Sequence, residues 1–115
     1  MKILVLEDEP DLLDLYEQSL SLAGHEVLRA RHGLEGIALL DQRPELILVD
    51  LMMPVMDGYQ FIRHLRRSPQ KDTPAIVLSA VATGAWSKHV GANGYIPKPF
   101  DYDALIATID RFRAA

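Results

Sequence analysis

The chain lacks several features that would place it in a particular class of protein. It contains no cysteine, which excludes disulfides and thiolate metal sites and favours a reducing compartment. It has no apolar run near the roughly 20 residues that a membrane helix needs. The apolar stretch at residues 3–6 is too short for a signal peptide because three acids follow it. The net charge of −4 does not favour a nucleic-acid-binding surface. We therefore expect a cytoplasmic protein that binds neither membrane nor nucleic acid directly.

The length and the hydrophobic pattern fit one α/β domain. At 115 residues the chain has room for a single domain, which we place at residues 1–115. Helical patterns lie between most of five short apolar runs, and such alternation predicts a parallel sheet with helices on both faces. The five predicted strands are Lys2–Leu6, Glu26–Ala30, Leu46–Val49, Ala75–Leu78 and Gly94–Ile96.

Four apolar helical faces accompany these strands. Apolar residues three or four positions apart predict that one side of each helix packs on the sheet. The faces are Leu12, Leu13, Leu15, Tyr16, Leu20 and Leu22; Leu34, Ile37, Ala38 and Leu40; Phe61, Ile62 and Leu65; and Leu105, Ile106, Ile109 and Phe112. Gly24 stands where a glycine commonly ends a helix, just after the first of these faces.

Chemically reactive side chains follow four of the five predicted strands. The first strand leads into Glu7-Asp8-Glu9, the third into Asp50, the fourth into Ser79, and the fifth, one residue later, into Lys98. In open parallel sheets, ligands bind where the carboxyl ends of the strands meet. We therefore expect acids, a hydroxyl and a lysine at one edge of the sheet.

This combination of side chains suits phosphoryl transfer. Two like charges about 4 Å apart repel by roughly 4 kcal/mol at an effective dielectric constant of about 20, so Glu7, Asp8 and Asp50 together need a cation. Mg2+ binds carboxylate and phosphate oxygens at the same time. Asp50 could then form an aspartyl phosphate, while Lys98 and Mg2+ neutralise the transferred group and Ser79 donates to a phosphate oxygen.

Each of these residues also has an ordinary structural explanation. An acid after a strand commonly forms a turn or caps a helix, and the acidic run before Pro10 fits the first turn of a helix. Lys98, between two prolines, has the setting of a solvated loop lysine, and Ser79 that of a capping serine. Their convergence on one edge of the sheet favours the chemical explanation.

Over essentially its whole length, the sequence resembles the receiver domains of two-component response regulators, the chemotaxis response regulators among them. The matching segments are Leu6-Glu7-Asp8-Glu9, Val49–Pro54 with Met56-Asp57-Gly58, Val77–Ala80 and Gly91–Phe100. No single segment is specific, but their order and spacing are. The resemblance implies a flavodoxin-like, doubly wound five-stranded parallel sheet with strand order 2-1-3-4-5.

The resemblance also implies a magnesium site. Asp50 matches the phosphoacceptor, which is itself a metal ligand in the family. Asp8 matches the acid that ligates Mg2+ directly, and Met52 matches the residue whose backbone carbonyl does so. Glu7 matches the first acid of the pair, where the family more often has Asp.

Three further residues match groups that neutralise charge or switch conformation in the family. Ser79 matches the switch hydroxyl, and Tyr95 the aromatic residue that turns inward when this hydroxyl moves to the phosphate. Lys98 matches the lysine that pairs with the phosphate. The peptide bond between Lys98 and Pro99 is expected to be cis.

As a member of that family, the chain would be a signalling phosphoacceptor rather than an enzyme with a free substrate. The phosphoryl group would come from a sensor histidine kinase or a phosphotransfer protein. The phosphorylated form would then present a changed surface to a downstream effector protein. Whether residues 1–115 act alone or within a longer chain stays open.

Three other functions are compatible with parts of the pattern. A flavodoxin-like electron carrier needs a hydroxyl- and glycine-rich phosphate loop, but this chain has Glu7-Asp8-Glu9-Pro10, which would repel FMN phosphate. An aspartate-nucleophile phosphatase needs a second acid two residues after its nucleophile, where this chain has Met52. A degenerate receiver would be a phosphorylation-independent interaction module, which the complete set of acids, hydroxyl and lysine disfavours.

One departure from the family pattern falls between Ser79 and Lys98. These residues are 19 positions apart, closer than the family usually has them. The stretch between them contains Gly84, which is unfavourable inside a helix, and Gly91, which offers a stop. We therefore predict that the fourth helix, between Ala80 and Val90, is shortened.

Overall fold

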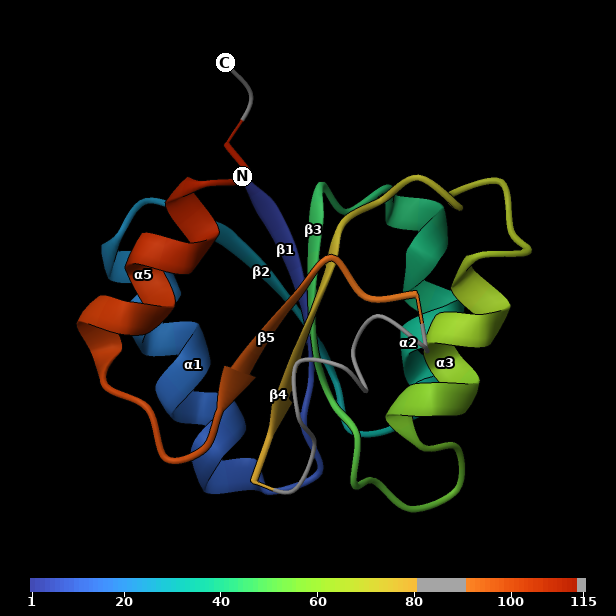
Figure 1. Ribbon diagram of the computed structural model, residues 1–115, viewed down its shortest axis with the longest axis horizontal. Coiled ribbons are helices and arrows are strands. Elements are labelled where there is room, and N and C mark those ends of the chain that lie inside the picture. The colour runs from blue at the N-terminus through green and yellow to red at the C-terminus, as the bar shows by residue number, and fades with distance from the viewer. Residues whose placement is uncertain (81–90, 114–115) are drawn as a thin grey trace.

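The computed structural model describes residues 1–80 and 91–113, and a five-stranded parallel sheet lies at its centre (Figure 1). The strand order is β2-β1-β3-β4-β5, and every neighbouring pair is parallel. The strands are β1 (Lys2–Leu6), β2 (Glu26–Ala30), β3 (Leu46–Asp50), β4 (Ala75–Ser79) and β5 (Gly94–Pro97). The predicted strands and their order are confirmed, and β3, β4 and β5 each extend one residue further than predicted.

Helices cover both faces of this sheet. Figure 1 shows α1 and α5 on one face and α2 and α3 on the other, which confirms the doubly wound arrangement. The helices of the described residues are α1 (Pro10–Leu22), α2 (Gly33–Leu39), α3 (Gly58–Leu65) and α5 (Tyr102–Asp110), and a 3-10 turn, η1 (Leu40–Gln42), follows α2. The predicted shortening of the fourth helix falls on residues 81–90, which lie outside the described part of the chain.

The strands supply two hydrophobic cores, because successive residues of a strand point to opposite faces. On β1, Ile3 and Val5 join the core under α1 and α5, whereas Leu4 and Leu6 join the core under α2 and α3. Every residue of β3 and β4 is buried. Because each buried aliphatic side chain contributes roughly 1.5–3 kcal/mol, the central strands form a rigid base for the residues that follow them.

The apolar face of α1 is narrower than its sequence predicted. Leu13, Tyr16 and Leu20 are buried, but Leu15 is 54% exposed and Leu22 is 88% exposed. At about 100° per residue, Leu15 and Leu22 lie about 200° and about 180° around the helix from Leu13. The prediction that these two leucines pack on the sheet was therefore wrong.

Helix α2 approaches the sheet most closely at a glycine. Leu34 was predicted to lie on its inner face but is 51% exposed. Gly36 is buried instead, and a Cβ atom there would lie 2.5 Å from Leu6 Cδ2 and 2.9 Å from Phe61 Cε1. The helix thus lies close to the sheet at a point that leaves no room for a side chain.

The ends of the helices agree with the capping rules. Gly24, with φ of 91°, follows the end of α1 as predicted. Asp57 and Gln60 form a reciprocal capping box at the start of α3. The side chain of Asp101 accepts from the backbone NH of Ala104 at the start of α5. None of the described helices is long and apolar enough to cross a membrane.

Candidate functional site

The reactive side chains predicted from the sequence lie at the carboxyl ends of the strands. Glu7 and Asp8 follow β1, Asp50 ends β3, Ser79 ends β4, and Lys98 follows β5. Because all five strands are parallel, these ends lie along the same edge of the sheet. The predicted convergence of acids, hydroxyl and lysine is therefore observed.

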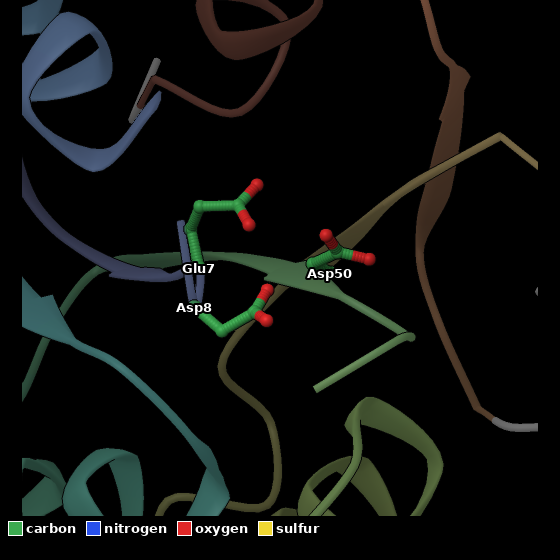
Figure 2. Close-up of side chains that lie close together, drawn as sticks. All are labelled: Glu7, Asp8 and Asp50. Carbon is green, nitrogen blue, oxygen red and sulfur yellow. The ribbon is translucent and has the colours of Figure 1, made fainter. Parts of the chain in front are cut away.

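Three carboxylates form the acidic part of this site. Figure 2 shows Glu7, Asp8 and Asp50 around a common space beside the ends of β1 and β3. One oxygen of each lies within 4.8 Å of the others. Glu7 and Asp50 are buried, while Asp8 is the most accessible of the three. The site therefore opens to solvent on the Asp8 side.

The geometry fits a small divalent cation with oxygen ligands. Mg2+ binds oxygen at about 2.0–2.1 Å, so two ligands on opposite sides of the ion are about 4.2 Å apart. The carboxylate oxygens, within 4.8 Å of one another, reach this spacing with small side-chain movements. Close carboxylates also repel one another, and a cation would remove that repulsion.

Lys98 partly neutralises the acids. Its Nζ atom lies 2.9 Å from Glu7 Oε1 and 2.9 Å from Asp50 Oδ2, and 18% of its side chain is exposed. The backbone NH of Lys98 donates to the carbonyl of Ser79 at 2.9 Å, which joins the lysine to the end of β4. The bond between Lys98 and Pro99 is cis, as predicted.

The ionisation of the buried groups follows from burial and from these ion pairs. Burial raises the pKa of Glu7 to about 7, although its hydrogen bond with Lys98 acts in the opposite direction and the charge of Asp50 raises it further. Burial by itself lowers the pKa of Lys98, but its hydrogen bonds with Asp50 and Glu7 outweigh burial and raise it above its ordinary value. The ammonium form of Lys98 is therefore strongly favoured.

The remaining predicted residues lie around Asp50. The backbone NH of Met52 donates to Asp50 Oδ1 at 3.0 Å, and the Met52 side chain is 63% exposed. Ser79 is buried, one residue beyond the position where β4 pairs with Asp50. The hydroxyl of Tyr95 donates to the Ser79 carbonyl at 3.5 Å, so Tyr95 and Ser79 are neighbours as their predicted roles require.

One contact in the site was not predicted from the sequence. Lys98 was expected to neutralise a phosphate, and its pairing with Glu7 was not foreseen. The two residues are 91 positions apart, and β3 and β4 separate their strands in the sheet. The strand order and the reach of a lysine side chain are the only signals that could have indicated this pair.

Comparison with known proteins decides the family. The sequence matches the family model of the response regulator receiver domain over residues 3–110. The chain belongs to this family. It is a receiver domain of the kind found in two-component signalling. This family assignment excludes the two alternatives considered from the sequence, a flavodoxin-like electron carrier and an aspartate-nucleophile phosphatase.

Curated relatives of this receiver domain differ in length. Protein PilH of Pseudomonas aeruginosa is 34% identical over 116 residues, and the match covers 95% of this chain and 94% of PilH. The DNA-binding dual master transcriptional regulator RpaA of Synechocystis sp. is 35% identical over 113 residues, and that match covers 94% of this chain but 47% of RpaA. The chain thus spans about half the length of several curated relatives.

Solved structures agree with this assignment. Chemotaxis protein CheY4 of Vibrio cholerae matches with a TM-score of 0.90 at 32% identity, covering 96% of this chain and 97% of CheY4. The receiver domain of sensor histidine kinase PA1611 from Pseudomonas aeruginosa PAO1 matches with a TM-score of 0.88 at 30% identity, covering 96% and 95% of the two chains. The PA1611 domain has a magnesium ion coordinated in its active site cleft.

Proposed function

We propose that residues 1–115 form one receiver domain in which Asp50 accepts a phosphoryl group in a Mg2+-dependent reaction. The donor would be a phosphohistidine of a sensor histidine kinase or of a phosphotransfer protein. The observation that carries the proposal is the setting of Asp50. Its carboxylate lies 2.9 Å from Lys98 Nζ and within 4.8 Å of two further carboxylates at the open end of the sheet.

The transfer step moves phosphorus from nitrogen to oxygen. A carboxylate oxygen of Asp50 attacks the phosphorus atom, the bond between phosphorus and the imidazole nitrogen breaks, and the electron pair stays on that nitrogen. Asp50 becomes an acyl phosphate. The hydrogen bond from the Met52 NH to Oδ1 holds the Asp50 carboxylate in a fixed orientation before attack.

The charge of the transferred group is neutralised by neighbouring residues. Lys98, which donates to Asp50 Oδ2, is placed to donate to a phosphoryl oxygen instead. Glu7, Asp8, Asp50 and the backbone carbonyl of Met52 would hold Mg2+. When bound, the ion offsets the negative charges of the acids and of the phosphoryl oxygens. The magnesium site of the PA1611 receiver domain supports this choice of metal.

Phosphorylation would then change the surface that partners bind. The Ser79 hydroxyl would donate to a phosphoryl oxygen, and Tyr95, whose hydroxyl donates to the Ser79 carbonyl, would follow this movement. The output is a signal to a downstream effector protein rather than turnover of a free substrate. RpaA binds DNA as a whole protein of about twice this length. We expect residues 1–115 to bind neither nucleic acid nor membrane directly and to act in the cytoplasm.

The test is chemical labelling of the phosphoacceptor. Incubation with acetyl phosphate and Mg2+ should add one phosphoryl group that hydroxylamine removes, as it does from acyl phosphates. Asp50→Asn should abolish labelling, while Asp103→Asn, an exposed acid in the first turn of α5, should leave it unchanged. Undiminished labelling of Asp50→Asn would show that another residue is the phosphoacceptor. A wild-type chain that is never labelled would favour the degenerate interaction module.

A further inference from the structure

We propose that a cavity between α1 and the segment that joins β5 to α5 binds a small, uncharged aromatic compound that carries a carbonyl group. The hydroxyl of Tyr16 would donate a hydrogen bond to the carbonyl oxygen, and apolar side chains would enclose the ring of the ligand. This binding needs no phosphoryl group, so it goes beyond the proposed phosphoacceptor role of Asp50.

The cavity has the size and the walls of a small-molecule site. Its volume is about 350 Å3, and ligand pockets commonly have volumes of about 300–1,000 Å3 and mainly apolar walls. The segment between β5 and α5 runs beside α1 (Figure 1). The apolar walls of the cavity come from Leu12, Leu15, Ala80, Pro99 and Phe100. Leu15, which does not pack on the sheet, thus lines a cavity that can take up an apolar group.

Tyr16 indicates that the ligand has a polar group. Tyr16 lines the cavity and is only 4% exposed. Within the described part of the chain, its hydroxyl has no hydrogen-bond partner. A buried hydroxyl without a partner is unfavourable, because it has lost its hydrogen bonds to water. The charges of Lys98, Glu7 and Asp50 all act on this hydroxyl, so it lies toward the end of the cavity that faces Asp50.

The Tyr16 hydroxyl is placed to donate a hydrogen bond to the ligand. Burial and the charges of Glu7 and Asp50 outweigh the opposite effect of Lys98 and raise the pKa of Tyr16 to about 12, so the hydroxyl keeps its proton at neutral pH. The positive charge of Lys98, which also lines the cavity, attracts the lone pairs of the hydroxyl oxygen and turns the O–H bond away from the lysine. The matching ligand group is an acceptor such as a carbonyl oxygen.

The surroundings also favour a ligand that is uncharged and aromatic. The three carboxylates of the acidic site outnumber the single ammonium group of Lys98, so they would repel an anionic ligand. The rings of Tyr16 and Phe100 are stacked, with their centroids 6.0 Å apart and an angle of 16° between their planes. Both residues line the cavity, and their nearly parallel rings offer flat surfaces against which a third ring can pack.

The binding experiment uses four probes of nearly the same size and shape. Acetophenone and benzamide carry an uncharged carbonyl group, benzoate carries a negative charge, and α-methylstyrene has a CH2 group in place of the carbonyl oxygen. Titrations followed by 1H–15N NMR report on the backbone amides of Leu12, Leu15 and Phe100. We expect acetophenone and benzamide to shift these amides in a saturable way, and benzoate to bind more weakly than benzamide because of the nearby carboxylates.

A substitution at Tyr16 tests the hydrogen bond itself. Tyr16→Phe removes one oxygen atom and should weaken the binding of acetophenone about threefold to tenfold, since a hydrogen bond contributes about that factor. The affinity for α-methylstyrene should not fall in this variant, which also checks that the cavity is still formed. Tyr102→Phe is the matched control, because the hydroxyl of Tyr102 donates to the carbonyl of Ser19 at 2.9 Å. This control should bind every probe as the wild type does.

Two results with acetophenone would overturn the proposal. One is the absence of shifts at the three amides up to the solubility limit of acetophenone. The other is a Tyr16→Phe variant that binds acetophenone as tightly as the wild type. Shifts at the same amides that grow with protein concentration in the absence of a probe would also overturn it, because a second copy of the chain would then fill the cavity. None of these results depends on whether Asp50 is labelled by a phosphodonor.

Discussion

The backbone NH of Met56 donates to the carbonyl of Pro54 at 2.8 Å, which closes a three-residue turn around Val55. Val55 has a φ of 70°, close to the value of about +75° that defines the rare and strained form of this turn. A β-branched residue is especially unfavourable at positive φ. The side chain of Val55 is 72% exposed, so little buried contact offsets the strain.

We expect that relieving this strain stabilises the receiver domain. Val55→Asn should raise the free energy of unfolding by about 1 kcal/mol, since asparagine tolerates positive φ and strained residues cost about 1–3 kcal/mol. Val55→Thr keeps the branched Cβ and should give no gain. Urea unfolding of the three proteins measures the difference. Equal stability of the Asn and Thr variants would show that the turn is not strained at this residue.

Much of the fold could be predicted because buried parallel strands form unbroken apolar runs. Leu46–Val49 has no polar residue, and the structure buries it on both sides. The position of the site could be predicted from the strands, because residues just beyond the carboxyl ends of parallel strands lie at one edge of the sheet. Leu15 and Leu22 show where prediction from apolar residues fails in a helix. The number of leucines in a helix exceeded what its inner face can hold, and only the packed structure shows which of them are buried.

Interactions between distant side chains were the least predictable part. The guanidinium group of Arg66, at the end of α3, donates to four oxygens: the backbone carbonyls of Lys71, Thr73 and Gly91 and the side chain of Asn93. The Glu7–Lys98 pair is a second example. Such contacts depend on the rotation of long side chains, which hydrophobic spacing does not encode.

The start of α3 lies against the backbone at the end of β3, the strand that ends in Asp50. The NH of Gly58 donates to the carbonyl of Leu51 at 3.1 Å. A Cβ atom on Gly58 would lie 2.5 Å from the carbonyl oxygen of Asp50 and 2.8 Å from Leu51 Cα. Backbone atoms cannot move aside as a flexible side chain can, so any side chain at this position must push α3 away from the end of β3.

Gly58→Ala should therefore affect both stability and the site. We expect a loss of about 1–3 kcal/mol in the free energy of unfolding, as for other overpacked positions. Labelling of Asp50 by acetyl phosphate should also be slower. Gly94→Ala is the matched control, because its Cβ would lie 3.6 Å from Ile76 Cγ1, an ordinary contact. Urea unfolding and labelling rates that are the same for both variants would contradict this prediction.

His25 lies between α1 and β2 with a positively charged group beside each ring nitrogen. The amino group of Met1 is 2.9 Å from Nδ1, and the guanidinium group of Arg113 is 3.2 Å from Nε2. Burial and these two charges lower the pKa of His25 below its ordinary 6.5, and they outweigh the opposite effect of Asp110 and Glu45. The imidazole is therefore held in its neutral form.

This lowered pKa predicts the direction in which stability depends on pH. In the unfolded chain His25 takes up a proton near pH 6.5, whereas in the folded chain it does so only at lower pH. The unfolded state thus binds more protons in this window. The free energy of unfolding therefore decreases as the pH drops below about 6.5, and this decrease ends when the pH reaches the pKa of His25 in the folded chain. His25→Asn should lose this part of the pH dependence, while His64→Asn, an exposed histidine on α3, should keep it. Urea unfolding at several values between about pH 5 and pH 8 compares the variants. Glu7, whose raised pKa also makes stability depend on pH, contributes equally to the wild type and to each variant, so its contribution cancels in the difference between them. A His25→Asn profile parallel to that of the wild type would mean that His25 titrates alike in the folded and unfolded chains.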